Sequence, residues 1–166
     1  MVKSAPGGVR EYLEVRKMGS EQTNREDTIR LLRECDAGIK MGTSSIREVL
    51  PAAEDRKLKQ MLQECMYRHE RLGKEVEAAL DRFGDEGKDP SLMAQAMSWL
   101  KTNGKLSVDG SDRTIADLMT DGANMGAKSL RKYMNQYSMA DEDAREIARR
   151  LAAMEEQLVE ELRPFL

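Results

Sequence analysis

Four ionisable residues could form one polar layer inside a helical protein: Asp36, His69, Asp121 and Glu155. Each lies in or beside a stripe of apolar residues at three-to-four spacing, which is typical of a helix face turned toward a core. If the chain turns back near residues 52 and 138, each of the four lies about 16–17 residues from a turn, and therefore at a similar height. Carboxylates and an imidazole are ligands for divalent metals such as Fe, Mn or Zn. The sequence therefore predicts a candidate metal site at these four residues.

The ligand set of a di-iron bundle is nevertheless incomplete. Such bundles carry a Glu on each of two helices and a Glu-x-x-His pair on each of the other two. Here one pair reads Met66-x-x-His69 and the other reads Glu155-x-x-Leu158, while Gly122 occupies a third inward position. A normal di-iron oxidase is not expected, and no cofactor is expected unless a divalent metal binds.

Two other interpretations of this layer remain open. Asp36 and His69 could form a buried hydrogen-bonded pair, because buried polar groups need partners. In that pair we expect the carboxylate to raise the pKa of the imidazole. Alternatively, thiolate and thioether groups that favour Cu(I) could form a softer site, from Met61, Cys65, Met66 and His69.

A ten-residue echo is the second feature with functional content. Residues 38–47 (GIKMGTSSIR) recur as residues 122–131 (GANMGAKSLR), so the chain resembles two related helical hairpins. A glycine inside a helix costs about 0.5–1 kcal/mol relative to alanine, so several of them need a reason. We expect four glycines to let two helices or two subunits pack closely, and the alternative is that they clear space for a ligand: Gly38, Gly42, Gly122 and Gly126.

The elements that must position these residues are all helices. Apolar periodicity predicts helices over residues 24–50, 52–83, 111–137 and 139–163, with a short helix over 90–101 in a long crossover. Residues 1–23 are expected to be a flexible or partly helical leader, and 24–166 a single domain. Two hairpins joined by one crossover predict an all-α four-helix bundle of the ferritin-like kind, in up-down-down-up order.

Composition excludes several classes of protein. Charged residues make up 34% of the chain and the net charge is −3, with both signs interspersed, so no basic face for nucleic acid is expected. No apolar stretch approaches the ~20 residues of a membrane span. Cys35 and Cys65 are too few for a disulfide scaffold, so we expect a cytoplasmic protein.

The run from Ile115 to Gly126, followed by Leu130-Arg-Lys-Tyr, resembles uncharacterised ferritin-like bundle proteins of bacteria. The resemblance covers residues 27–166 and implies the fold rather than an activity. No catalytic residue and no cofactor-binding motif is predicted. We therefore expect a non-catalytic structural or interaction protein with a homodimer or another protein as partner. The alternative is a metal-binding or redox protein with a reduced ferritin-like site.

Overall fold

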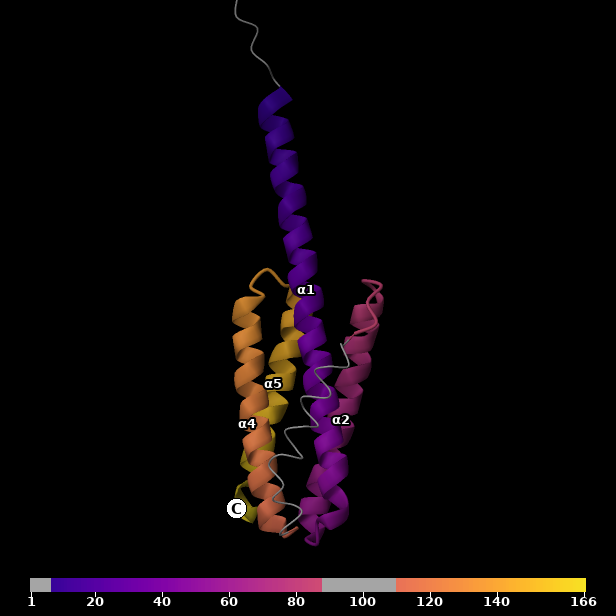
Figure 1. Ribbon diagram of the computed structural model, residues 1–166, viewed down its shortest axis with the longest axis vertical. Coiled ribbons are helices and arrows are strands. Elements are labelled where there is room, and N and C mark those ends of the chain that lie inside the picture. The colour runs from indigo at the N-terminus through magenta and orange to yellow at the C-terminus, as the bar shows by residue number, and fades with distance from the viewer. Residues whose placement is uncertain (1–6, 88–109) are drawn as a thin grey trace, which may run out of the picture.

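The computed structural model describes residues 7–87 and 110–166, and every regular element in these ranges is a helix (Figure 1). The four long helices are α1 (Gly7–Val49), α2 (Arg56–Asp81), α4 (Asp112–Gln136) and α5 (Glu142–Leu162). Short 3-10 helices follow α1 at Leu50–Ala52 and α5 at Arg163–Phe165. The predicted all-α fold with four long helices is confirmed, and the predicted helix at 90–101 lies outside the described residues.

The helices form two antiparallel hairpins, α1 with α2 and α4 with α5, and these pack side by side (Figure 1). The residues that follow α2 lie at the end of the bundle where Arg25 donates to the carbonyl oxygen of Phe83, whereas Gly110, before α4, lies against Ala52 at the other end. The second hairpin therefore starts at the end opposite to that where the first hairpin finishes. The described helices run in the predicted up-down-down-up order.

Capping residues set the helix starts, and two of them differ from the sequence prediction. Asp55 caps α2 by accepting hydrogen bonds from the backbone N–H groups of Lys57 and Leu58, so α2 begins four residues later than predicted. Pro51 lies instead in the preceding 3-10 turn. Asp141 caps α5 through the N–H of Ala144. The predicted starts at residues 52 and 139 are thus four and three residues too early, because an Asp side chain that accepts from first-turn N–H groups fixes each start.

The first helix starts much earlier than predicted, at Gly7, and has no break near residue 24. Residues 8–26 are all exposed, and this part of α1 projects beyond the bundle (Figure 1). Ion pairs one helical turn apart, Arg10 with Glu14 and Lys17 with Glu21, support it. The leader was expected to be flexible or partly helical because it lacks an inward apolar stripe, but described residues 7–23 are helical throughout.

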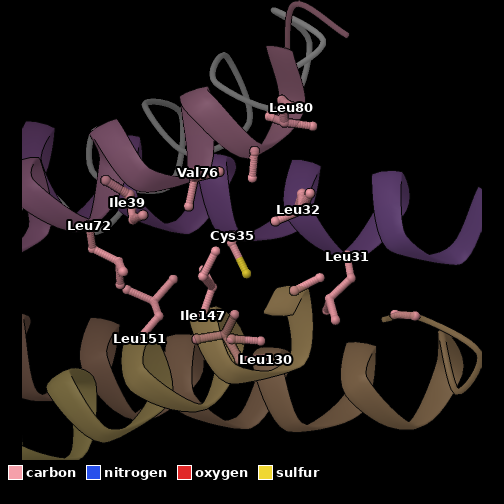
Figure 2. Packing of buried hydrophobic residues seen from close by; sticks show 14 of the residues in the cluster. Leu31, Leu32, Cys35, Ile39, Leu72, Val76, Leu80, Leu130, Ile147 and Leu151 are labelled. Carbon is pink, nitrogen blue, oxygen red and sulfur yellow. The ribbon is translucent and has the colours of Figure 1, made fainter. Parts of the chain in front are cut away.

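The core consists of two apolar clusters, one toward each end of the bundle, and all four long helices contribute to both. Figure 2 shows the first cluster, in which Cys35 of α1 lies among leucine, isoleucine and valine side chains of the other helices. The second cluster surrounds Cys65 of α2. Both thiols are free and fully buried. The polar residues of the site lie in neither cluster.

Each hairpin holds the turn of the other. Asp112, at the start of α4, accepts hydrogen bonds from the backbone N–H groups of Glu54 and Asp55 at 2.8 Å each. At the opposite end, Asp27 accepts from the N–H of Met139, and the hydroxyl of Thr28 accepts from the N–H of Asp141. The two ends are therefore fastened by equivalent contacts, as the echo of residues 38–47 at 122–131 would lead one to expect.

Candidate functional site

The centre of the candidate site is a buried pair formed by His69 of α2 and Glu155 of α5. The imidazole Nε2 lies 3.0 Å from the carboxylate Oε1 of Glu155, and the Nδ1 lies 2.9 Å from the backbone carbonyl oxygen of Cys65. His69 is 1% exposed and Glu155 is 7% exposed. Two ionisable groups are thus held away from water in the middle of the bundle.

The geometry defines the protonation state of the ring. A carbonyl and a carboxylate oxygen can only accept hydrogen bonds, so both ring nitrogens must donate, which requires the imidazolium form. Burial lowers the pKa of His69, but the hydrogen bonds to Cys65 and Glu155 and the negative charge of Glu155 outweigh it and raise that pKa to about 10. At neutral pH His69 is therefore an imidazolium that is hydrogen-bonded to Glu155.

Two of the echoed glycines make room for this pair. A Cβ atom at Gly42 would lie 3.1 Å from the Cδ2 and Nε2 atoms of the His69 ring. A Cβ atom at Gly126 would lie 3.4 Å from the carboxyl carbon of Glu155. Each glycine therefore faces a side chain from the second helix of its own hairpin. At these two positions the small residue leaves space for a polar side chain of the same hairpin, and the predicted close packing of two helices or two subunits through the four glycines stays a prediction.

Only two of the four predicted metal ligands come together. The carboxylate of Asp36 accepts a hydrogen bond from Lys40 at 2.7 Å, and Asp121 is exposed. The expected pairing of Asp36 with His69 is wrong, because Cys65 and Glu155 occupy both ring nitrogens.

The reason lies in the hairpin turns. Gly42, six residues after Asp36, is the α1 residue that faces His69, which displaces Asp36 by about 9 Å along the bundle. The 3-10 turn and the Asp55 cap add residues between α1 and α2 that a turn at residue 52 does not allow for. In the second hairpin, Gly126 rather than Asp121 is level with Glu155.

The residues of the alternative soft site are only partly gathered. The Cys65 sulfur lies 3.6 Å from the Nδ1 of His69, whereas Met61 and Met66 are partly buried against the second apolar cluster. Among the described residues, no group of three or more His, Cys, Asp or Glu side chains converges as metal ligands would.

A cavity of about 360 Å³ lies beside the pair, between α1 and α4. Its walls carry five equivalent positions of the two echo copies: Gly38, Met41, Gly42, Ser45 and Ile46 from α1, and Gly122, Met125, Gly126, Ser129 and Leu130 from α4. His69 and Glu155 reach it from the other two helices. The echoed motif thus builds two facing walls, which fits the ligand-clearing interpretation of the glycines.

The described lining of the cavity is mostly apolar and carries no lysine or arginine. Its charged groups are the imidazolium of His69 and the carboxylates of Glu34 and Glu155. Tyr133 also lines it, and burial together with the nearby carboxylate of Glu34 raises the pKa of this tyrosine. One positive and two negative groups leave the lining with an excess of negative charge.

The pairing of His69 with Glu155 was missed, although the sequence contains a signal for it. Within the echo the two copies are offset by 84 positions. Since α4 continues three residues further beyond its copy than α1 does, and the turn that follows is one residue shorter, the offset between α2 and α5 becomes 86. With that offset His69 and Glu155 are equivalent residues. Neighbouring buried positions on the two helices also correspond, such as Leu72 with Leu158.

Comparison of this chain with family models, with curated proteins and with solved structures gives no match. Over residues 7–87 and 110–166, fold and site define an all-helical protein with four long helices and a buried ion pair beside a cavity. None of the described helices is both long enough and apolar enough to cross a membrane.

Proposed function

We propose that this chain is a non-catalytic helical bundle that binds a small, largely apolar molecule with one ammonium group. The observation that carries the proposal is the cavity between α1 and α4, which both copies of the echo line and which His69 and Glu155 reach. Ligand sites are commonly concave and mostly apolar, with a few polar groups that converge on them. Buried free thiols at Cys35 and Cys65 fit a reducing compartment, so we place the protein in the cytoplasm.

The size of the cavity limits the ligand. A cavity of about 150 Å³ is known to hold benzene, so 360 Å³ suits a molecule of roughly twice that size. The apolar part would contact methionine and leucine side chains, which adapt to irregular shapes. Affinity would come mainly from the removal of apolar surface from water.

The charge of the cavity lining indicates which polar group the ligand carries. An ammonium would meet the carboxylates of Glu34 and Glu155, whereas a carboxylate ligand would meet the same two negative charges and no lysine or arginine among the described lining residues. Glu155 uses one oxygen, Oε1, for His69, which leaves Oε2 able to accept from a ligand. A cationic donor is therefore the best match.

Three matched probes test this proposal: benzylamine, benzyl alcohol and benzoate, titrated into the protein and followed by NMR. We expect benzylamine to bind most tightly and benzoate least. The variant Ser129→Leu should fill the cavity and abolish binding, whereas Lys128→Leu, at the neighbouring exposed position, should leave binding unchanged. Equal binding of all three probes, or binding unaffected by Ser129→Leu, would contradict the proposal.

The second candidate is a divalent metal held by His69 and Glu155. Its support is the hydrogen bond from Nδ1 to the Cys65 carbonyl, which orients Nε2 toward Glu155 as the outer contacts of metal-binding histidines do. Elemental analysis of protein purified without chelator or affinity metal tests it. Stoichiometric Fe, Mn or Zn that is lost in His69→Ala would favour the metal over the organic ligand.

A further inference from the structure

The part of α1 that projects from the bundle has exposed apolar side chains without a partner in the described structure. Val9 is 73% exposed, Tyr12 is 65% exposed and Leu13 is 55% exposed. The bundle begins only at Arg25, whose guanidinium donates to the backbone carbonyl of Phe83. Most of the stability of a helix in a protein comes from the packing of an apolar face, and residues 7–24 have no such packing within the described structure.

On one face of this segment, large side chains occupy the N-terminal half and small side chains occupy the C-terminal half. Helical spacing places Val9, Tyr12 and Leu13 on the same face as three small residues further along: Gly19, Ser20 and Thr23. The hydroxyl groups of Ser20 and Thr23 already donate to carbonyl oxygens of their own helix. The space around Gly19 is open. The small half is thus a shallow surface onto which larger side chains can pack.

The charges along one edge of this face are self-complementary. Arg10, Glu14, Lys17 and Glu21 follow one another at four-three-four spacing and alternate in sign. When two copies pack antiparallel about a twofold axis near residue 16, this edge meets the same edge of the other copy. Arg10 then faces Glu21, and Glu14 faces Lys17, in two symmetric sets.

Almost the same register, with the twofold axis at residue 16 rather than midway between residues 15 and 16, also matches the two halves of the face. It places Leu13 opposite Gly19, Tyr12 opposite Ser20 and Val9 opposite Thr23, so each large residue meets a small one. A partner helix in this register meets Asn24 with its Gly7 and stops short of Arg25, where the bundle begins. Shape and charge therefore select one orientation and one register.

We infer that this protein self-associates as an antiparallel dimer through residues 7–24 of α1, with the two bundles at opposite ends. One residue opposes the contact, because Arg16 meets its own copy near the axis. Its stem can cover Tyr12 while its guanidinium reaches water. This proposal is independent of the cavity and its ligand.

Two charge-swapped variants test the register. Arg10→Glu with Glu14→Lys keeps an ion pair within the helix but places like charges opposite Glu21 and Lys17 of the other copy. Lys17→Glu with Glu21→Lys does the same from the other side. Each variant alone should dimerise at least about tenfold more weakly, since four attractive pairs become repulsive. An equimolar mixture restores all four attractions, so a heterodimer should form with wild-type affinity.

Sedimentation velocity over a range of concentrations measures these affinities, with one variant fluorescently labelled in the mixture. Leu13→Glu should also abolish the dimer, whereas Tyr67→Ser, an equally exposed site on the bundle, should not. Arg16→Leu should tighten it. A wild-type chain that stays monomeric at about 100 μM, where a micromolar complex is saturated, overturns the inference. Homodimers unaffected by the swaps, or variants that do not recombine, overturn it as well.

A separate experiment tests the antiparallel orientation of the two helices in the dimer. Spin labels on Gln22→Cys lie about 20 Å apart along the axis in the antiparallel dimer and side by side in a parallel one. Cys35 and Cys65 are buried and should not be labelled in the native protein. A short distance between the two labels excludes the proposed arrangement.

Discussion

At His69, burial and pairing act on the imidazole pKa in opposite directions, and pairing prevails, raising it from 6.5 to about 10. A group whose pKa is higher in the folded than in the unfolded chain binds its proton more tightly when folded. Its contribution to stability is therefore fully present below pH 6.5 and is lost as the pH rises through the folded value of about 10. The stability of this protein should fall on the alkaline side.

We predict that the free energy of unfolding decreases by on the order of 1–4 kcal/mol between pH 6.5 and 10 because of this pair. Urea melts across this range measure it. The control is the double variant His69→Leu with Glu155→Leu, which should lose the dependence and cost little at neutral pH. Glu155→Leu alone leaves a buried imidazolium and should cost about 3–5 kcal/mol at pH 6, and less at pH 9. A pH profile shared by wild type and double variant would contradict the assignment.

The two glycines of the first echo copy should respond differently to alanine. At Gly38 the new Cβ would lie 3.6 Å from a methyl group of Leu151, an ordinary contact, so Gly38→Ala should stabilise the protein by about 0.5–1 kcal/mol. At Gly42 the Cβ would lie 3.1 Å from a ring held by two hydrogen bonds. Gly42→Ala should therefore destabilise by about 1 kcal/mol. Urea melts of the two variants measure these changes in stability. Equal changes would mean that the His69 ring can shift away from the new methyl group at no cost.

At the scale of the elements, the apolar spacing predicted four helices and most of their inward residues, and the long linker between the two hairpins predicted their order. It misplaced the turn of the first hairpin, because Pro51 and the Asp55 cap are both acceptable starts and only packing chooses between them. Because of this error of a few residues, the predicted alignment of the two helices placed Asp36 at the height of His69. The pairing of His69 with Glu155 depends on which helices are neighbours, which the periodicity of a single helix does not contain.

The contact of Asp112 with the first turn should be worth more than an ordinary surface carboxylate. This side chain accepts from the N–H groups of Glu54 and Asp55, and hydrogen bonds to a charged acceptor are the stronger kind. We predict that Asp112→Ala costs about 1–3 kcal/mol. Asp143, which also lies in the first turn of a helix but is exposed, provides the matched control, because the helix-dipole effect is the same there. Chemical denaturation measures the free energy of unfolding of both variants. Equal losses would mean that Asp112 stabilises the protein only through the helix dipole.

For the whole molecule, the two apolar clusters raise the question of whether the halves unfold separately. Burial, with the nearby carboxylates of Glu34 and Asp36, raises the pKa of Cys35 to about 12, so this thiol does not react in the folded state. Cys65 is 1% exposed in the other cluster. Since all four long helices cross both clusters, we predict that the two thiols are alkylated at the same rate, limited by global unfolding. Peptide mapping after iodoacetamide pulses measures both, and faster reaction at Cys65 would reveal independent opening of its half.

The reciprocal fastening of the two turns has a kinetic consequence. The residues that hold each turn are 57 or more positions away in the sequence, so neither hairpin can complete its own turn before it docks on the other. Contacts between distant residues form late, because the chain between them must be ordered first. Loss of the Asp112 carboxylate should thus accelerate unfolding and leave the refolding rate nearly unchanged. The contacts at the two ends of this bundle therefore set the lifetime of the native state rather than the rate at which the chain folds.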